Sequence, residues 1–158
     1  MQRMMPLSEP LAKTIGAVAL ALRDARDPWW IISSAAAALH GAQPITVADV
    51  DVILSQEDAS RLFPQLGIAP LPPSDHPRFR SAVFGRWLVP PLAVEFMAGF
   101  ELRDTDGLWR PVVPQTREAV SLGPTTVFVP ARAELRTMFA RFGRAKDHSR
   151  IALLDRIG

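Results

Sequence analysis

Residues 29–54, WWIISSAAAALHGAQPITVADVDVIL, predict a strand, a short helix, a loop and a second strand. The first four residues are apolar, and they predict a short buried strand. Residues 35–40 predict a helix that ends at Gly41. The β-branched side chains of residues 47–54 predict the second strand. This alternation of strand and helix favours an α/β fold.

Two serines stand at the step between the first strand and the helix. A serine at this place can cap the helix through its hydroxyl. The same step points backbone N–H groups outward, which is a ready site for an anion. The sequence leaves both interpretations of Ser33 and Ser34 open.

Three acidic residues lie within apolar strand patterns. Asp49 and Asp51 alternate with valines, so they share one face of the second strand. Glu95 lies in the middle of residues 92–100, another predicted strand. Carboxylates in such positions are costly to bury without partners. If the two strands are neighbours, the three carboxylates converge, and their oxygens suit Mg²⁺ or Mn²⁺.

The remaining chain predicts further helices and strands around this stretch. Helical periodicity or capping signals mark residues 8–27, 56–66, 131–142 and 146–157. Strand patterns mark residues 79–89 and, more weakly, 108–113, 119–122 and 126–129. Residues 68–78 contain four prolines and predict a loop, either over the site or across the surface. We expect one domain over residues 1–158, with residues 1–7 as a loose lead-in and residues 131–158 as C-terminal helices.

Composition narrows the functional class. The chain has 158 residues, of which 48% are hydrophobic, as in one globular domain with a sizeable core. It has no cysteine, which excludes thiolate nucleophiles and cysteine metal sites and fits a reducing compartment. No apolar run approaches the ~20 residues of a membrane span. We therefore expect a soluble cytoplasmic protein without a membrane partner.

The C-terminal part of the chain is basic, although the formal net charge is only +2. Elsewhere acids and bases are interspersed, so the sequence shows no concentrated patch for nucleic acid. Two interpretations of this basic part stay open: solvated helix faces, or a wall that faces phosphate in an acidic site. The residues are Arg136, Arg141, Arg144, Lys146, Arg150 and Arg156.

The order of these motifs resembles that of the nucleotidyltransferase superfamily. The matching segments are Ile32-Ser33-Ser34, Asp49-Val50-Asp51-Val52 and Val94-Glu95-Phe96. They are similar to the family's strand and glycine-containing step into a helix, its acid–x–acid pair, and its later third acid. Residues 39–54 and 142–157, the latter with an Arg–x–Lys–Asp segment, resemble a minimal bacterial branch. That branch includes members of toxin–antitoxin and abortive-infection systems.

The resemblance implies a fold, a reaction and a set of site residues. The fold would be α/β (α+β), a mixed sheet flanked by helices with a C-terminal helical pair. The reaction would move a nucleoside monophosphate from an NTP to a hydroxyl of a small molecule, a protein or an RNA, with Mg²⁺ or Mn²⁺. The implied metal ligands and catalytic residues are Asp49, Asp51 and Glu95, with Glu95 as a possible base. The implied nucleotide-binding residues are Ser33, Ser34, Arg144 and Lys146.

Three departures from the family pattern keep other hypotheses open. Ser33 stands where glycine is usual, Glu95 where aspartate is usual, and Phe139 near a frequent lysine. A second hypothesis is therefore a catalytically degenerate protein of the same fold that binds a partner, for example in a toxin–antitoxin-type system. A third is an unrelated α/β protein whose acids pair with the C-terminal arginines.

Overall fold

The computed structural model describes residues 7–158. Residues 1–6 of the predicted lead-in lie outside the described residues. The helices are α1 (Glu9–Ala21), α2 (Ser33–Leu39), α3 (Gln56–Leu66), α4 (Arg132–Phe142) and α5 (Ala145–Asp155). The strands are β1 (Trp30–Ile32), β2 (Asp49–Leu54), β3 (Phe79–Trp87), β4 (Ala93–Arg103), β5 (Trp109–Pro111), β6 (Glu118–Leu122) and β7 (Thr125–Val129). None of the described helices is long and apolar enough to cross a membrane.

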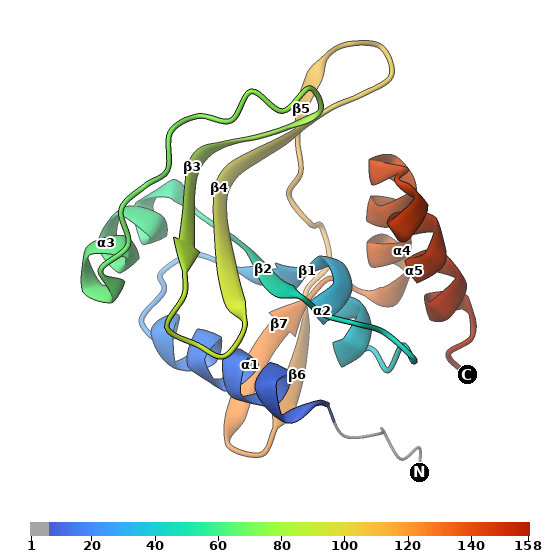
Figure 1. Cartoon of the computed structure of the whole chain (residues 1–158), viewed down its shortest axis with the longest axis horizontal. Coiled ribbons are helices and arrows are strands. Elements are labelled where there is room, and N and C mark those ends of the chain that lie inside the picture. Colours follow the sequence, from blue (N-terminus) through green and yellow to red (C-terminus); the bar gives the residue numbers. More distant parts are fainter. Residues whose placement is uncertain (1–6) are drawn as a thin grey trace.

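The central sheet is mixed, as the resemblance implies. Its strand order is β1-β2-β4-β3, with β5 on the distal part of β4, and β6 pairs with β7 in a separate hairpin (Figure 1). β2 and β4 run parallel, whereas β1–β2, β3–β4 and β4–β5 are antiparallel. A parallel pair needs a long crossover, and α3 together with β3 supplies it. This crossover brings the two acid-bearing strands side by side.

The two faces of this sheet differ in character. Val52, Val94 and Phe96 are fully buried on one face, and α3 packs against it. The ring of Phe63 on α3 lies 6.0 Å from the ring of Phe96. A Cβ added at Gly85 of β3 would lie 2.7 Å from the Phe63 ring, so this close approach of helix and sheet requires glycine. Because side chains alternate along a strand, the acids project from the opposite face.

A local capping signal predicts α3 correctly, and a contact made by the same helix accompanies an α1 that is shorter than predicted. The Ser55 hydroxyl accepts a hydrogen bond from the Asp58 backbone N–H at 3.0 Å. The Asp58 carboxylate accepts the backbone N–H groups of Arg26 at 3.0 Å and Asp27 at 2.9 Å. Those two N–H groups therefore do not continue the first helix, which ends at Ala21 and not at residue 27.

The predicted C-terminal helical pair is present. α4 and α5 lie against each other beside the sheet (Figure 1), and Gly143 separates them with a φ of 68°. The buried side chains of α4 include Leu135 and Phe139. The Arg78 guanidinium donates to the carbonyls of Phe142 at 2.6 Å and Arg141 at 3.0 Å. Arg78 therefore ties the end of the proline-rich loop to the C-terminus of α4.

Candidate active site

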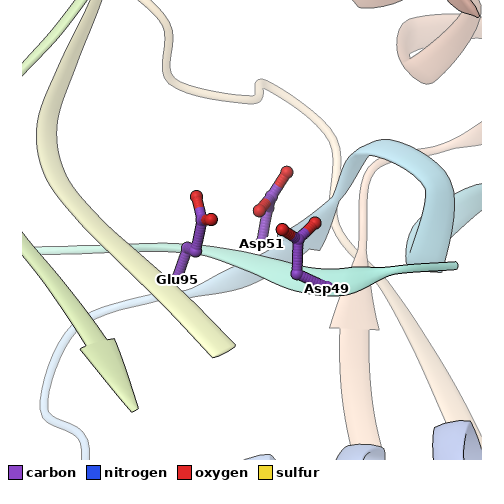
Figure 2. A group of neighbouring side chains, drawn as sticks. All are labelled: Asp49, Asp51 and Glu95. Atoms are coloured by element: carbon purple, nitrogen blue, oxygen red, sulfur yellow. The ribbon is translucent and has the colours of Figure 1, made fainter. Parts of the chain in front are cut away.

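The three predicted acids converge on one side of the sheet. Asp51 of β2 stands directly beside Glu95 of β4 in the strand register. Figure 2 shows Asp49 and Asp51 projecting on the same side as Glu95. One carboxylate oxygen from each of the three lies within 4.8 Å of the others. The parallel register therefore produces the cluster that the sequence predicts.

Charge repulsion and burial perturb this cluster. Burial, followed by the charges of Glu95 and Asp49, raises the pKa of Asp51 to about 7. Burial and the charge of Asp49 also raise the pKa of Glu95, while the charges of Arg86 and Lys146 act in the opposite direction. Mutually repelling carboxylates at this spacing favour a bound cation. Their hard oxygen donors fit Mg²⁺ or Mn²⁺.

Ser33 has an unusual backbone conformation at the start of α2. Its φ is +58°, in the left-handed region that favours glycine. This conformation explains why glycine suits the position in the resembling family. Of the two interpretations of Ser33 and Ser34, capping through a hydroxyl is wrong: α2 begins at Ser33, its N-cap residue is Ile32, and no side chain makes a cap hydrogen bond. The Ser33 side chain instead hydrogen-bonds to Asp51 on the neighbouring strand.

Ser33→Gly is expected to be more stable than Ser33→Ala by about 1 kcal/mol. Both variants lack the hydroxyl, so the hydrogen bond to Asp51 is lost in each. They differ in the left-handed strain, which alanine keeps and glycine removes at some cost in chain entropy. Urea denaturation of the two variants measures this difference, and equal midpoints with equal slopes would contradict the strain.

A cavity of about 390 Å³ opens onto the acidic cluster. Asp51, Glu95 and Ser33 line it together with Arg144. Ser34 is buried and does not line it. Residues 71–74 of the proline-rich loop form part of its wall. Of the two interpretations of this loop, the structure therefore supports the one that places it at the site.

The basic C-terminal residues divide into two groups. Arg136 pairs with Asp155, and Arg141 pairs with Asp104, so both serve ion pairs away from the acids. Arg144 lines the cavity. Lys146 is exposed, and its charge acts on Glu95. Arg144 and Lys146, the two basic residues that the resemblance implied for nucleotide binding, therefore belong to the group near the acids.

Two further arginines face the cluster: Arg150, which the sequence placed in the possible phosphate-facing wall but not among the implied nucleotide-binding residues, and Arg86, which it did not select. Arg150 interacts electrostatically with Asp51, and its side chain is only 17% exposed. It lies one helical turn after Lys146, which is a signal that spacing alone could have supplied. Arg86 stands beside Glu95 in the strand register, with 3.6 Å between Nε and Oε1. Only the strand pairing reveals this contact.

Asp147 holds two of these guanidiniums in place. It is fully buried, and its carboxylate accepts Arg144 Nε at 2.6 Å and Nη2 at 3.1 Å. The same carboxylate lies 3.6 Å from Arg150 Nη1. One buried acid therefore orients two cations at the N-terminal part of α5, the part of the helix that supplies the basic side of the site.

The mixed sheet, its parallel acid-bearing strands and the flanking helices define the fold of the nucleotidyltransferases. TM1012 of Thermotoga maritima, an inferred nucleotidyltransferase, superposes with a TM-score of 0.75 at 19% identity, covering 91% of each chain. LnuA, a lincosamide antibiotic adenylyltransferase solved with lincomycin, gives 0.61 at 10% identity, covering 98% of this chain and 100% of LnuA. The antibiotic-resistance factor ANT(2'')-Ia gives 0.57 at 11% identity, covering 90% and 82% of the two chains.

No protein-family model matches the chain, and no curated protein matches it in sequence. The structural likeness, at these identities, establishes the fold. The convergence of the three acids within 4.8 Å counts against the third hypothesis, in which the acids serve only as partners of the C-terminal arginines. The choice between an enzyme and a degenerate relative depends on the site itself.

Proposed function

We propose that this protein is a metal-dependent nucleotidyltransferase that moves a nucleoside monophosphate from an NTP to a hydroxyl group. One observation carries the proposal: three carboxylates lie within 4.8 Å of one another, and two of them line a cavity, on a fold shared with nucleotidyltransferases. A structural acid cluster would more often be paired within the chain.

The reaction forms one bond and breaks one. The acceptor oxygen bonds to the α-phosphorus of the NTP, the bond from that phosphorus to the bridging oxygen breaks, and pyrophosphate leaves with the bonding electrons. The hydroxyl proton passes to Glu95 as general base. Asp49, Asp51 and Glu95 would hold a divalent cation, which would supply Lewis-acid stabilisation of phosphate charge.

The residues around the acids have separate roles in this proposal. Arg144, Lys146 and Arg150 neutralise the triphosphate, because guanidinium and ammonium groups bind phosphate oxygens strongly. The Ser33 hydroxyl orients Asp51 through the hydrogen bond between them. Ser34 supports the same turn from a buried position in the first turn of α2.

One observation favours the second hypothesis, a degenerate relative that binds without turnover. Two of the three acids already have partners in the chain, Ser33 on Asp51 and Arg86 on Glu95. These partners compete with a cation for the carboxylates. The Arg86 side chain is 45% exposed, so this ion pair is weak and easily displaced.

The test measures melting temperature and pyrophosphate release with Mg²⁺ and each of the four NTPs. We expect at least one NTP to raise the melting temperature by several degrees with Mg²⁺, but not without it, since a ligand that binds the folded state stabilises it. Glu95→Gln should lose the gain, whereas Glu118→Gln, on the separate hairpin, should keep it. Binding without pyrophosphate release in the presence of varied alcohols supports the degenerate protein. No shift with any NTP contradicts the proposed reaction and leaves a degenerate protein that binds a partner.

A further inference from the structure

Beyond the acids, one part of the cavity wall is apolar, and we call this part the apolar wall. It includes Phe79, Phe84, Phe100 and Phe142, together with Leu71 and Pro72 of the proline-rich loop. The ring of Phe79 lies 5.5 Å from that of Phe142 and 6.1 Å from that of Phe100. Because these rings pack on one another, the apolar wall is preformed and does not depend on a ligand for its shape.

The carboxylates of the wall offer no unassigned charge to a polycationic ligand. Among the described residues, the carboxylates that line the cavity are Asp51 and Glu95, which the proposed cation uses. The two lining arginines each have an acidic partner in the chain. Arg80 Nε lies 2.8 Å from Glu101, and Arg144 Nε lies 2.6 Å from Asp147. A polycation therefore finds no unassigned carboxylate among the described lining residues, whereas Arg144 is the lining arginine that the proposed function assigns to the triphosphate.

The polar groups of the wall also suit a nucleobase poorly. His76 Nδ1 accepts the backbone N–H of Arg78 at 3.1 Å and that of Phe79 at 3.2 Å. The Ser74 hydroxyl accepts the backbone N–H of His76 at 3.0 Å. These bonds use His76 Nδ1 and Ser74 Oγ as acceptors, so fewer acceptors remain for the N–H groups of a base placed here. An acceptor with an apolar body and one hydroxyl needs fewer such partners.

We propose that this apolar wall binds the acceptor, and that the acceptor is an uncharged small molecule with an aromatic or aliphatic ring body and a hydroxyl directed at the acids. This proposal rests on the proposed function and names the substrate class for it. The cavity volume of about 390 Å³ lies in the range of small-molecule sites. The adenylyltransferase LnuA, with its bound lincomycin, shows that this fold accommodates a small molecule.

The test uses 2-naphthol, a neutral aromatic alcohol, and measures its binding by saturation-transfer NMR without any turnover. We expect binding to the wild-type protein, weakened by about tenfold in Phe84→Ala, because one ring of the wall is lost. The matched control is Val83→Ala on the same strand, whose side chain does not line the cavity. It should bind within about twofold of wild type, since neighbouring strand residues face opposite sides. Ala82→Trp, at an exposed lining residue, should also weaken binding by narrowing the cavity.

Competition distinguishes the possible occupants of the wall. Mg²⁺ with the four α,β-methylene NTP analogues should leave 2-naphthol bound, and spermine should not displace it. Displacement by an analogue would assign the wall to the nucleobase, and displacement by spermine would assign it to a cationic ligand. Either result, or equal binding by wild type and all variants, overturns the proposal. 2-Naphthol binding needs no transfer reaction. If the protein binds 2-naphthol but binds no NTP, the wall remains a small-molecule site and the proposed reaction is refuted.

Discussion

Asp51→Asn is expected to lower the rate of nucleotidyl transfer by about a thousandfold or more, because it removes a charged ligand from the proposed cation site. Asparagine keeps the size of the side chain and can still accept the hydrogen bond from Ser33. The loss should therefore come from charge and not from misfolding. Initial rates of pyrophosphate release, with the best NTP and acceptor at saturation, measure it.

The same substitution is expected to stabilise the metal-free protein at neutral and higher pH. Burial and two neighbouring carboxylates raise the pKa of Asp51 in the folded state from 3.8 to about 7. Below pH 3.8 the group is protonated in both states and contributes nothing. As the pH rises from about 4 to about 7, the unfolded chain ionises first, so the folded state loses stability. The full penalty, on the order of 2–4 kcal/mol, is present above pH 7 and is absent in the asparagine variant.

Urea unfolding at pH 5 and at pH 8, with a chelator present to remove metal, tests the direction of this change in stability. The gap between Asp51→Asn and wild type should widen from pH 5 to pH 8. Asp24→Asn provides the control, because the Asp24 side chain is 89% exposed and lies 3.8 Å from Arg23 Nε. An Asp51→Asn variant that keeps full activity, or that is less stable than wild type at pH 8, would contradict the electrostatic account of the site.

Asp147→Ala is expected to destabilise the protein by about 3 kcal/mol, the lower end of the range for breaking a buried ion pair. The change leaves Arg144 and Arg150 facing each other without the carboxylate between them. It also removes the hydrogen bond from the Arg144 backbone N–H to Asp147, 3.1 Å long, at the start of α5. The Arg144 side chain is 36% exposed, and this partial screening by water is the reason for the lower end of the range.

Asp155→Ala on the same helix is the matched control. Asp155 also pairs with an arginine, Arg136, at 2.8 Å, but both side chains are about half exposed. An exposed pair of this kind contributes about 0–1 kcal/mol. If urea denaturation shows equal losses of stability in the two variants, Asp147 contributes no more than an exposed acid does, and it does not organise the basic side of the site.

The sequence predicted those features that depend on local signals. Ser55 and Gly67 bound α3 at the predicted residues, because an N-cap hydroxyl and a left-handed glycine act within one turn. Alternation placed Asp49 and Asp51 on one face of a strand. Their meeting with Glu95 was conditional on two strands being neighbours, and the parallel β2–β4 pair satisfies that condition.

Features that depend on strand register and long-range packing were not predicted. Arg86 reaches Glu95 only because β3 pairs with β4 in one particular register. The apolar wall joins Phe79, Phe100 and Phe142, which come from two strands and a helix far apart in the chain. The backbone of Ser33 was also missed, since serine gives no sequence signal for a positive φ.

The most direct test of the central claim is a crystal soaked with Mn²⁺ and the NTP that gives the largest rise in melting temperature. Anomalous scattering then locates manganese independently of the protein model. We expect a peak coordinated by Asp49, Asp51 and Glu95, with the triphosphate between this peak and the Arg144, Lys146 and Arg150 side of the cavity. A nucleotide bound elsewhere, or no manganese at the three carboxylates at saturating concentration, would contradict the account.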